Sequence, residues 1–217
     1  MALKQAEVNW HRLQKKRVYF FMSRFCDVIF STLGLIILSP LLLVIALLIK
    51  WDNPHAPVIF SQDRVGKDGV IFKMFKFRTM VPDAEKHLKE LLKYNEVEGA
   101  MFKMKNDPRV TPIGAFLRRT SLDELPQLWN VIKGEMSLVG PRPPLIREVE
   151  MYTEYDKQRL LVRPGCTGLW QVSGRNELSF EEMVQLDIQF INHLSMKQYF
   201  CIIFRTFGVF FRKKGAY

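Results

Sequence analysis

The sequence LRRTSLDELP holds the densest group of residues able to do chemistry, an adjacent pair of carboxylates formed by Asp123 and Glu124. An ionised carboxylate can attack phosphorus or bind a hard cation such as Mg²⁺. Arg118 and Arg119 precede the pair, and guanidinium groups match phosphate oxygens two at a time. The segment is therefore a candidate for phosphate chemistry. A capping box of Ser121 and Glu124 at a helix start explains the same residues without catalysis, and is favoured on this segment alone.

Further cations lie where the backbone restricts their direction. FKMFKFRTM is typical of a strand, in which Lys76 and Arg78 share one face because side chains alternate. Arg142 stands between two prolines in GPRP, and Arg163 and Arg175 adjoin proline or glycine. Together with the carboxylate pair, these cations indicate a pyrophosphate site.

Motifs of several large enzyme classes are absent from the sequence. It contains no G-x-x-x-x-G-K-[ST] loop, no G-x-G-x-x-G after a strand, no H-E-x-x-H, no G-x-S-x-G and no Asp-x-Asp. Its three cysteines are widely spaced and form no C-x-x-C pair, which favours a reduced, cytoplasmic setting. Any chemistry must then come from carboxylates and basic residues.

The charge balance and one apolar run indicate the partners. The chain carries 32 Lys+Arg against 22 Asp+Glu, a net charge of +10, which suits nucleic acid, acidic lipid or a phosphorylated substrate. Residues 28–49 contain no charge and are long enough to cross a bilayer. A nucleic-acid-binding protein needs no such run, so we predict anionic membrane lipids as partners and no nucleic acid.

The apolar run is interrupted at Ser39-Pro40. Proline removes a helix hydrogen bond, so the helix should bend there. Both flanks of the run are basic, and positive flanks prefer the cytoplasmic side of a membrane. A kinked helix that enters and leaves through the cytoplasmic leaflet satisfies both flanks, whereas a single tilted span explains the same pattern about equally well.

Periodicity predicts a small set of elements after this run. The last 35 residues or so mix bulky apolar side chains with Arg and Lys, which fits either a helix in the membrane interface or one packed on the core. The expected elements are strands at 58–60 and 70–77 with a turn at 66–69, helices at 82–94 and 124–132, a cap at Gly134, turns through 137–176 and a helical stretch at 180–214.

The sequence closely resembles a known family, the bacterial sugar transferases, also called monotopic polyprenyl-phosphate phosphoglycosyl transferases. The match runs from Arg24 to Tyr217. The motifs that carry it are the Ser39-Pro40 break, KFRTM at 76–80, SLDELPQLWNVIKGEMSLVGPRP at 121–143, RPGCTGLWQVSGRN at 163–176, Asp187 and the closing Gly215-Ala-Tyr217.

The resemblance implies an α+β fold in three parts. A basic arm at 1–23 would precede a re-entrant membrane helix–break–helix at 24–50, and 51–217 would form a mainly helical cytoplasmic domain with a small β-hairpin and interfacial amphipathic helices. The protein would be monotopic, on the cytoplasmic face of the bacterial inner membrane. With 23 residues before the apolar run, it resembles the minimal catalytic form.

The resemblance also implies an activity. Asp123 would attack the sugar-linked phosphate of a UDP-sugar, releasing UMP, and undecaprenyl phosphate would then accept the phosphosugar, as the first membrane step of capsule or exopolysaccharide assembly. Glu124 would assist, Mg²⁺ would sit at Asp123, and Lys76, Arg78, Arg118, Arg142 and Arg175 would neutralise phosphates. UDP-glucose or UDP-galactose is the expected donor. The alternative is a non-catalytic membrane-anchored protein that binds acidic lipid or assembly partners; the oligomeric state, a homodimer included, stays open.

Overall fold

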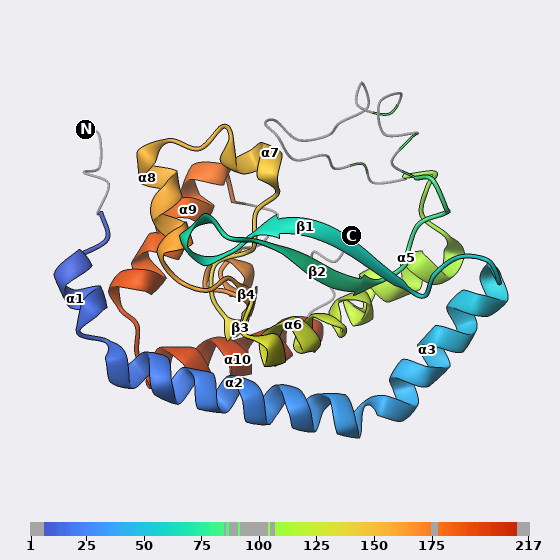
Figure 1. Ribbon diagram of the computed structural model, residues 1–217, viewed down its shortest axis with the longest axis horizontal. Helices are drawn as coiled ribbons and strands as arrows, with labels where there is room; N and C mark the ends of the chain where they lie inside the picture. Colours follow the sequence, from blue (N-terminus) through green and yellow to red (C-terminus); the bar gives the residue numbers. More distant parts are fainter. Residues whose placement is uncertain are drawn as a thin grey trace.

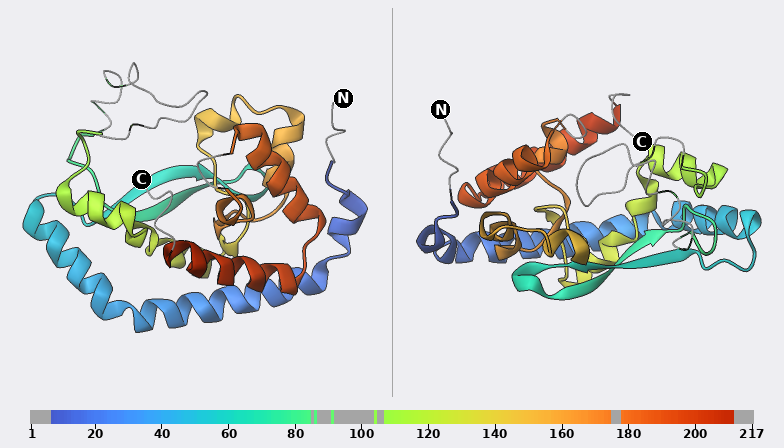
Figure 2. Two further views of the ribbon diagram at one scale, coloured as in Figure 1. Left: turned by 180° about the vertical axis from the view of Figure 1, so that it is seen from behind. Right: turned by 90° about the horizontal axis from the view of Figure 1, so that it is seen from above.

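The structure is a computed structural model that describes residues 7–84, 86, 91, 104, 107–174 and 178–211. Two consecutive helices, α2 (Arg17–Ile37) and α3 (Ser39–Asp52), form an arc along one side of the molecule (Figure 1). A β-hairpin lies on one side of this arc and helices α9 (Phe180–Asn192) and α10 (Met196–Phe211) lie on the other (Figure 2, right). The fold is α+β and mostly helical, as predicted.

The predicted bend in the apolar run is confirmed. Helix α2 ends at Ile37 and α3 starts at Ser39 in a new direction (Figure 1). Pro40 occupies the first turn of α3, where its missing N–H costs no hydrogen bond, and the Ser39 hydroxyl donates to the carbonyl of Ile36 at 2.8 Å. In the described part of the chain, α2 alone is long and apolar enough to cross a membrane.

Helix α2 is fixed to the rest of the protein by two charged side chains. The Arg24 guanidinium donates to the carbonyls of residues 131 and 132, which are among the last of α6. The Asp27 carboxylate, only 1% exposed, accepts from the backbone N–H of Leu138 at 2.9 Å and from the Tyr199 hydroxyl at 2.7 Å. An otherwise apolar helix thus has a defined rotation against the domain.

The hairpin consists of β1 (Ile59–Val65) and β2 (Ile71–Phe77), which pair antiparallel. The first strand is longer than the predicted 58–60, because its polar second half is paired in full with β2. Asn130 covers the free edge of β2: its side chain accepts from the N–H of Phe75 at 3.0 Å and donates to the carbonyl of Lys73 at 2.7 Å. Helix α6 thereby replaces a third strand.

The segment between the hairpin and residue 134 differs from the prediction. Residues 112–119 form helix α5 (Pro112–Arg119), which the sequence analysis missed although Thr111 caps it and Pro112 starts it. The expected helix at 124–132 is divided into the 3-10 turn η3 (Leu122–Glu124) and helix α6 (Gln127–Lys133). Gly134 ends α6 at φ 84, as predicted.

The remaining chain completes the domain. Strands β3 (Ser137–Val139) and β4 (Gly165–Thr167) pair in parallel within the region expected to hold only turns, and one break divides the predicted C-terminal helical stretch into α9 and α10. The predicted helix at 82–94 falls mainly outside the described residues. The other elements are α1 (Trp10–Gln14), α7 (Ile146–Val149), α8 (Glu154–Lys157) and 3-10 turns η1 (Lys67–Gly69), η4 (Gln158–Leu161) and η5 (Trp170–Val172).

Candidate active site

The 3-10 turn η3 presents the two carboxylates at the edge of the hairpin. Leu122 and Leu125 pack into an apolar cluster built on Ile45, Ile49, Phe77 and Leu117, whose members come from α3, β2 and α5. Burial of the two leucines anchors the turn from both ends. The carboxylates between them are therefore held by a framework of hydrophobic contacts from three elements.

The capping-box explanation of this segment is wrong. Ser121 adopts a left-handed conformation, φ 53, and makes no side-chain cap hydrogen bond. The Glu124 side chain is bonded to a lysine instead of to the backbone. A non-glycine residue in this conformation costs free energy, and such strain is concentrated at functional sites. The geometry therefore favours a functional explanation of the pair.

Lys76 of β2 binds the pair unequally. Its Nζ lies 2.6 Å from Glu124 Oε1 and 3.9 Å from Asp123 Oδ2. The Asp123 side chain is only 10% exposed, whereas the Glu124 side chain is 40% exposed. Glu124 therefore receives the direct ion pair, and Asp123 is the more deeply buried and the less compensated of the two.

The two pKa values diverge as a result. Burial raises the pKa of Asp123 to about 6, against opposing attraction from Lys76. Burial also acts to raise the pKa of Glu124, but Lys76, followed by Arg142 and Arg64, outweighs it, and the pKa of Glu124 falls below its usual value. At pH 7 both carboxylates are largely ionised, with Asp123 the more basic.

Arg118 is the second cation close to Asp123. Its Nε donates to Thr79 Oγ1 at 2.9 Å, which fixes the guanidinium, and its charge acts to lower the pKa of Asp123. Arg119 follows on the helix about 100° further round and is exposed. Its side chain makes no hydrogen bond or ion pair with the described residues. Consecutive helical residues cannot both face the same group, so only Arg118 of this pair joins the site.

Arg142 approaches the pair from the proline-rich loop. Its Nη1 lies 3.3 Å from Glu148 Oε2, and its charge helps to hold down the pKa of Glu124. The buried Glu148 carboxylate also accepts from the backbone N–H of Leu145 at 2.9 Å. Gly140, which precedes the loop, touches the Gly165 backbone so closely that a Cβ on either residue would overlap the other chain segment. The loop that carries Arg142 is thus fixed at both ends.

Arg64 of β1 belongs to the same cluster, and sequence reasoning missed it. The side chain is buried; Nη1 donates to the carbonyl of Pro143 at 3.0 Å and Nη2 to Gln62 Oε1 at 2.8 Å. Burial, followed by repulsion from Arg142, lowers the pKa of Arg64 to about 10. The described residues give it no ion pair. The predicted first strand ends at residue 60, so the sequence offers no signal for Arg64. In the observed register Arg64 pairs with Phe72, which lies on the same face of β2 as Lys76, so Arg64 shares that face.

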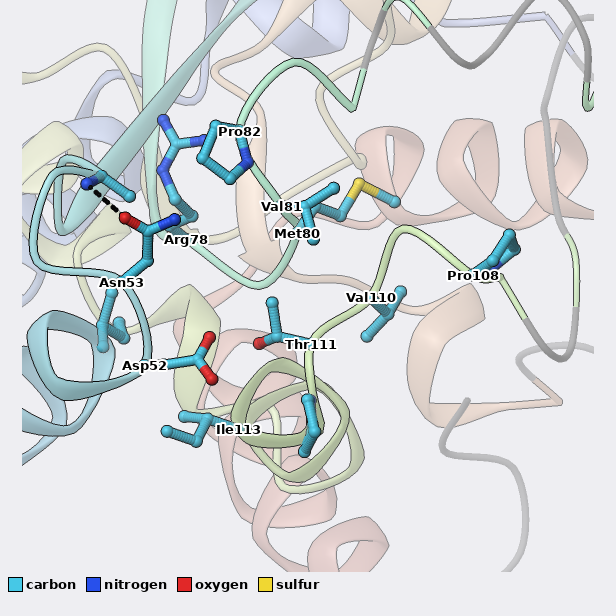
Figure 3. Close-up of a pocket in the computed structure, with 13 residues that line it drawn as sticks. Asp52, Asn53, Arg78, Met80, Val81, Pro82, Pro108, Val110, Thr111 and Ile113 are labelled. Atoms are coloured by element: carbon cyan, nitrogen blue, oxygen red, sulfur yellow. Dashed lines mark hydrogen bonds between the residues drawn. The ribbon is translucent and has the colours of Figure 1, made fainter.

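Two other predicted site cations, Arg78 and Arg163, are not brought to the carboxylates, and a third lies outside the described residues. Arg78 donates through Nε to the carbonyl of Pro57 at 2.9 Å and lines a separate cavity of about 410 Å³ with Asp52 and Thr111 (Figure 3). Arg163 is half-buried, and its side chain makes no hydrogen bond or ion pair within the described ranges. Arg175 lies outside the described residues.

The carboxylates are compatible with a substrate-bound metal ion. Within the described residues, no group of three or more His, Cys, Asp or Glu side chains could hold a metal alone. Mg²⁺ is commonly bound by one or two carboxylates together with substrate phosphates. The pair formed by Asp123 and Glu124 matches that donor set only if a diphosphate supplies the remaining oxygens.

The sequence matches a family model described as bacterial sugar transferase over residues 18–213. The chain is 44% identical over 218 residues to an undecaprenyl-phosphate galactose phosphotransferase of Salmonella typhimurium (97% of this chain, 45% of that protein). It is 40% identical over 200 residues to a UDP-glucose:undecaprenyl-phosphate glucose-1-phosphate transferase of Escherichia coli (88% and 40%). It is also 42% identical over 195 residues to the exopolysaccharide production protein ExoY of Rhizobium meliloti (88% and 86%).

The chain spans less than half the length of the Salmonella and Escherichia proteins and most of the length of the Rhizobium protein. The matched range includes the bent apolar helices, the hairpin, the carboxylate pair and the proline-rich loop. The chain belongs to the bacterial sugar transferase family.

Proposed function

We propose that the protein transfers a sugar 1-phosphate from a UDP-sugar to undecaprenyl phosphate and releases UMP. The names of the Salmonella and Escherichia relatives support this acceptor, and they favour UDP-galactose or UDP-glucose as the donor. The Rhizobium relative supports a place in exopolysaccharide production. The reaction would be the first membrane step in assembling such a glycan.

In the first step, an oxygen of the Asp123 carboxylate attacks the sugar-linked phosphorus of the donor. A bond forms between that oxygen and phosphorus, the bond from phosphorus to the bridging oxygen breaks, and UMP leaves with the bonding electrons. The product is a phosphosugar–aspartyl intermediate. In the second step, a phosphate oxygen of the acceptor attacks the same phosphorus and the Asp123 carboxylate departs, leaving a polyprenyl diphosphate sugar.

The unequal environment of the two carboxylates is the observation that carries this assignment. Asp123 is buried, 3.9 Å from Lys76 and raised in pKa to about 6. A basic carboxylate that is still ionised at pH 7 is suited to attack phosphorus. Glu124 is the weaker base, because its pKa is depressed and it is bonded to Lys76 at 2.6 Å. We assign Glu124 to orienting Lys76 rather than to removing a proton.

The surrounding cations supply what phosphoryl transfer needs. Catalysis of this reaction is mostly positioning and stabilisation of moving negative charge. Lys76 and Arg118 are close to Asp123, while Arg142 and Arg64 are close to Glu124. We propose that the first two neutralise the attacked phosphate and that Arg142 neutralises the leaving nucleotide. Arg64 holds the loop that carries Arg142.

Mg²⁺ would be held by Asp123 together with diphosphate oxygens. When bound, it would supply positive charge to the diphosphate and stabilise the leaving group. The chain's own residues orient the substrate beside that charge: Lys76 through its bond to Glu124, and Arg118 through its bond to Thr79.

The bent helices suit a monotopic arrangement at the cytoplasmic face of the membrane. Many apolar side chains on α2 and α3 are exposed, among them Ile37, Leu43 and Trp51, and burying such a surface in lipid is favourable. A helix pair bent at Ser39-Pro40 could enter and leave through one leaflet. Both basic flanks would then remain beside anionic lipid headgroups. This arrangement would hold Asp123 where a soluble donor and a lipid phosphate can both reach it.

The decisive experiment uses the purified full chain with Mg²⁺, undecaprenyl phosphate and a panel of UDP-sugars, with released UMP as the readout. We expect UMP from at least one donor. With that donor alone, one equivalent of UMP should appear and intact mass should rise by one phosphosugar at Asp123. Failure of every donor would overturn the function, and product formation without any enzyme-bound phosphosugar would overturn the two-step route.

Two variants make the experiment specific. Asp123→Asn should release no UMP in either format, because the amide cannot form the acyl phosphate. Arg119→Gln is the matched control: it removes an adjacent cation that is exposed and unpaired in the described part of the chain. It should keep wild-type rates, which would show that a change of one unit of charge near the site does not by itself stop the reaction.

A further inference from the structure

An apolar groove of about 560 Å³ lies in the angle between the bent helices and the hairpin. Its wall includes Leu42 and Ala46 of α3, Phe75 and Phe77 of β2, and Trp129 of α6. No lining side chain carries a charge. The groove is therefore suited to hydrocarbon and unsuited to any part of a nucleotide sugar.

The protein leaves this groove open. Trp129 is 53% exposed and Leu43, another lining residue, is 61% exposed. By contrast, Ile45 and Ile49 of the same helix are buried against Phe77 and Leu117. One side of α3 packs inside the domain, while its neighbouring side borders an unfilled apolar channel. Exposed aromatic and aliphatic surface of this kind is stabilised when a hydrocarbon ligand covers it.

The groove lies close to the carboxylate site at one end, although neither carboxylate lines it. Pro126, which lines it, is two residues after Glu124 and three after Asp123. At a 3-10 rise of about 2 Å per residue, the chain from Asp123 to Pro126 spans only about 6 Å. Phe75 and Phe77 alternate with Lys76 along β2, so one strand supplies Lys76 to the carboxylates and two aromatic rings to the groove. The turn at Pro126 is the wall between the two.

We propose that this groove binds the isoprene units next to the phosphate of the lipid acceptor. The inference rests on the proposed function, which requires a ligand with a phosphate at one end and a branched hydrocarbon at the other. Only that substrate needs a charged site and an apolar channel within a few bonds of each other. With the chain in the groove, the phosphate would pass around Pro126 toward Asp123 and Lys76. The groove would then select the acceptor and take no part in donor binding.

The test fills the groove and follows the two half-reactions separately. Ala46→Trp places an indole in the channel, and Leu47→Trp is the matched control, because Leu47 is adjacent, 61% exposed and not part of the lining. Donor-only UMP release should be unchanged in both variants. In detergent, the KM for farnesyl phosphate and for undecaprenyl phosphate should rise about tenfold or more in Ala46→Trp only, the loss expected from about 1.4 kcal/mol of binding.

The outcomes separate this inference from the function on which it rests. If Ala46→Trp leaves both acceptor KM values unchanged, the groove takes an ordinary bilayer lipid and the inference fails. If it abolishes donor-only UMP release as well, the groove is not specific to the acceptor, and the inference fails again. Should the indole disturb folding, Trp129→Ala gives an independent reading: it enlarges the groove and should also raise the acceptor KM without changing donor-only release. No UMP from the wild-type chain would instead overturn the proposed function.

Discussion

Replacing Asp123 by asparagine should abolish activity and at the same time stabilise the fold. The side chain is buried and its pKa is raised to about 6 from an ordinary value near 3.8. A folded-state pKa above the unfolded value means that ionisation of this carboxyl penalises folding. The penalty is absent at low pH, grows as the pH rises from about 4 to 6, and is complete above that range.

The magnitude follows from the pKa difference. About two pKa units at 1.36 kcal/mol each give a penalty of about 3 kcal/mol at pH 8. The raised pKa already includes the attraction of Lys76 and Arg118, so a neutral asparagine escapes the whole penalty. We expect a gain of up to about 3 kcal/mol at pH 8, which for a domain of this size raises Tm by up to roughly 6–12 °C. Between pH 8 and pH 4.5 the gain should shrink by about two thirds.

The assay is thermal unfolding of both proteins in the same detergent at pH 8, 6 and 4.5. Glu124→Gln is the matched control of opposite sign. In the wild type, the pKa of Glu124 is depressed, so the ionised carboxylate stabilises the fold above its ordinary pKa. The glutamine variant loses this contribution and should therefore melt below the wild type at pH 8. An Asp123→Asn protein that melts at or below the wild-type temperature at pH 8, or whose advantage does not shrink at pH 4.5, would refute the reasoning.

Three further predictions test the site and its framework. Donor-only UMP release should fall about tenfold per pH unit below pH 6, because the ionised fraction of Asp123 falls at that rate; a flat rate from pH 7 to 5 would contradict it. Ser121→Gly should retain stability within about 1 kcal/mol, whereas Ser121→Val should lose about 2 kcal/mol in thermal melts, because a β-branched residue tolerates φ 53 poorly. Tyr199→Phe should cost about 1–3 kcal/mol by removing a donor to the buried Asp27 carboxylate, and equal Tm values for this variant and the control Tyr155→Phe would exclude that role.

The parts of the fold that sequence could predict are those with a local signal. Proline in an uncharged run predicts a bend wherever the helix lies, and Gly134 ends a helix because few other residues favour φ 84. The parallel pair of β3 and β4 could not be predicted. Each strand has three residues, and their pairing depends on close contact between the Gly140 and Gly165 segments, which are far apart in the sequence.

In the candidate site, too, features with a local sequence signal were predictable and features that depend on tertiary contacts were not. The juxtaposition of Asp123 with Glu124, and the chemistry available to both, were evident from the sequence. The difference between their roles was not evident from the sequence, because burial and the unequal distances to Lys76 depend on how β2 packs against η3. Arg64 was missed because it lies on a strand whose second half contains mostly polar residues, and its burial depends on the loop that carries Pro143.

The hairpin connects the bent helices α2 and α3 to the carboxylate pair. Phe77 of β2 is buried against Ile45 and Ile49 of α3, and the adjacent Lys76 is bonded to Glu124. Because one short strand makes both contacts, the depth of α3 in the proposed membrane arrangement would fix the height of Lys76, and with it the carboxylates, relative to the lipid headgroups. The proposed encounter with a lipid phosphate therefore depends on the packing around Phe77 as much as on any charge. A bent helix that moved independently of β2 would separate the acceptor from the nucleophile.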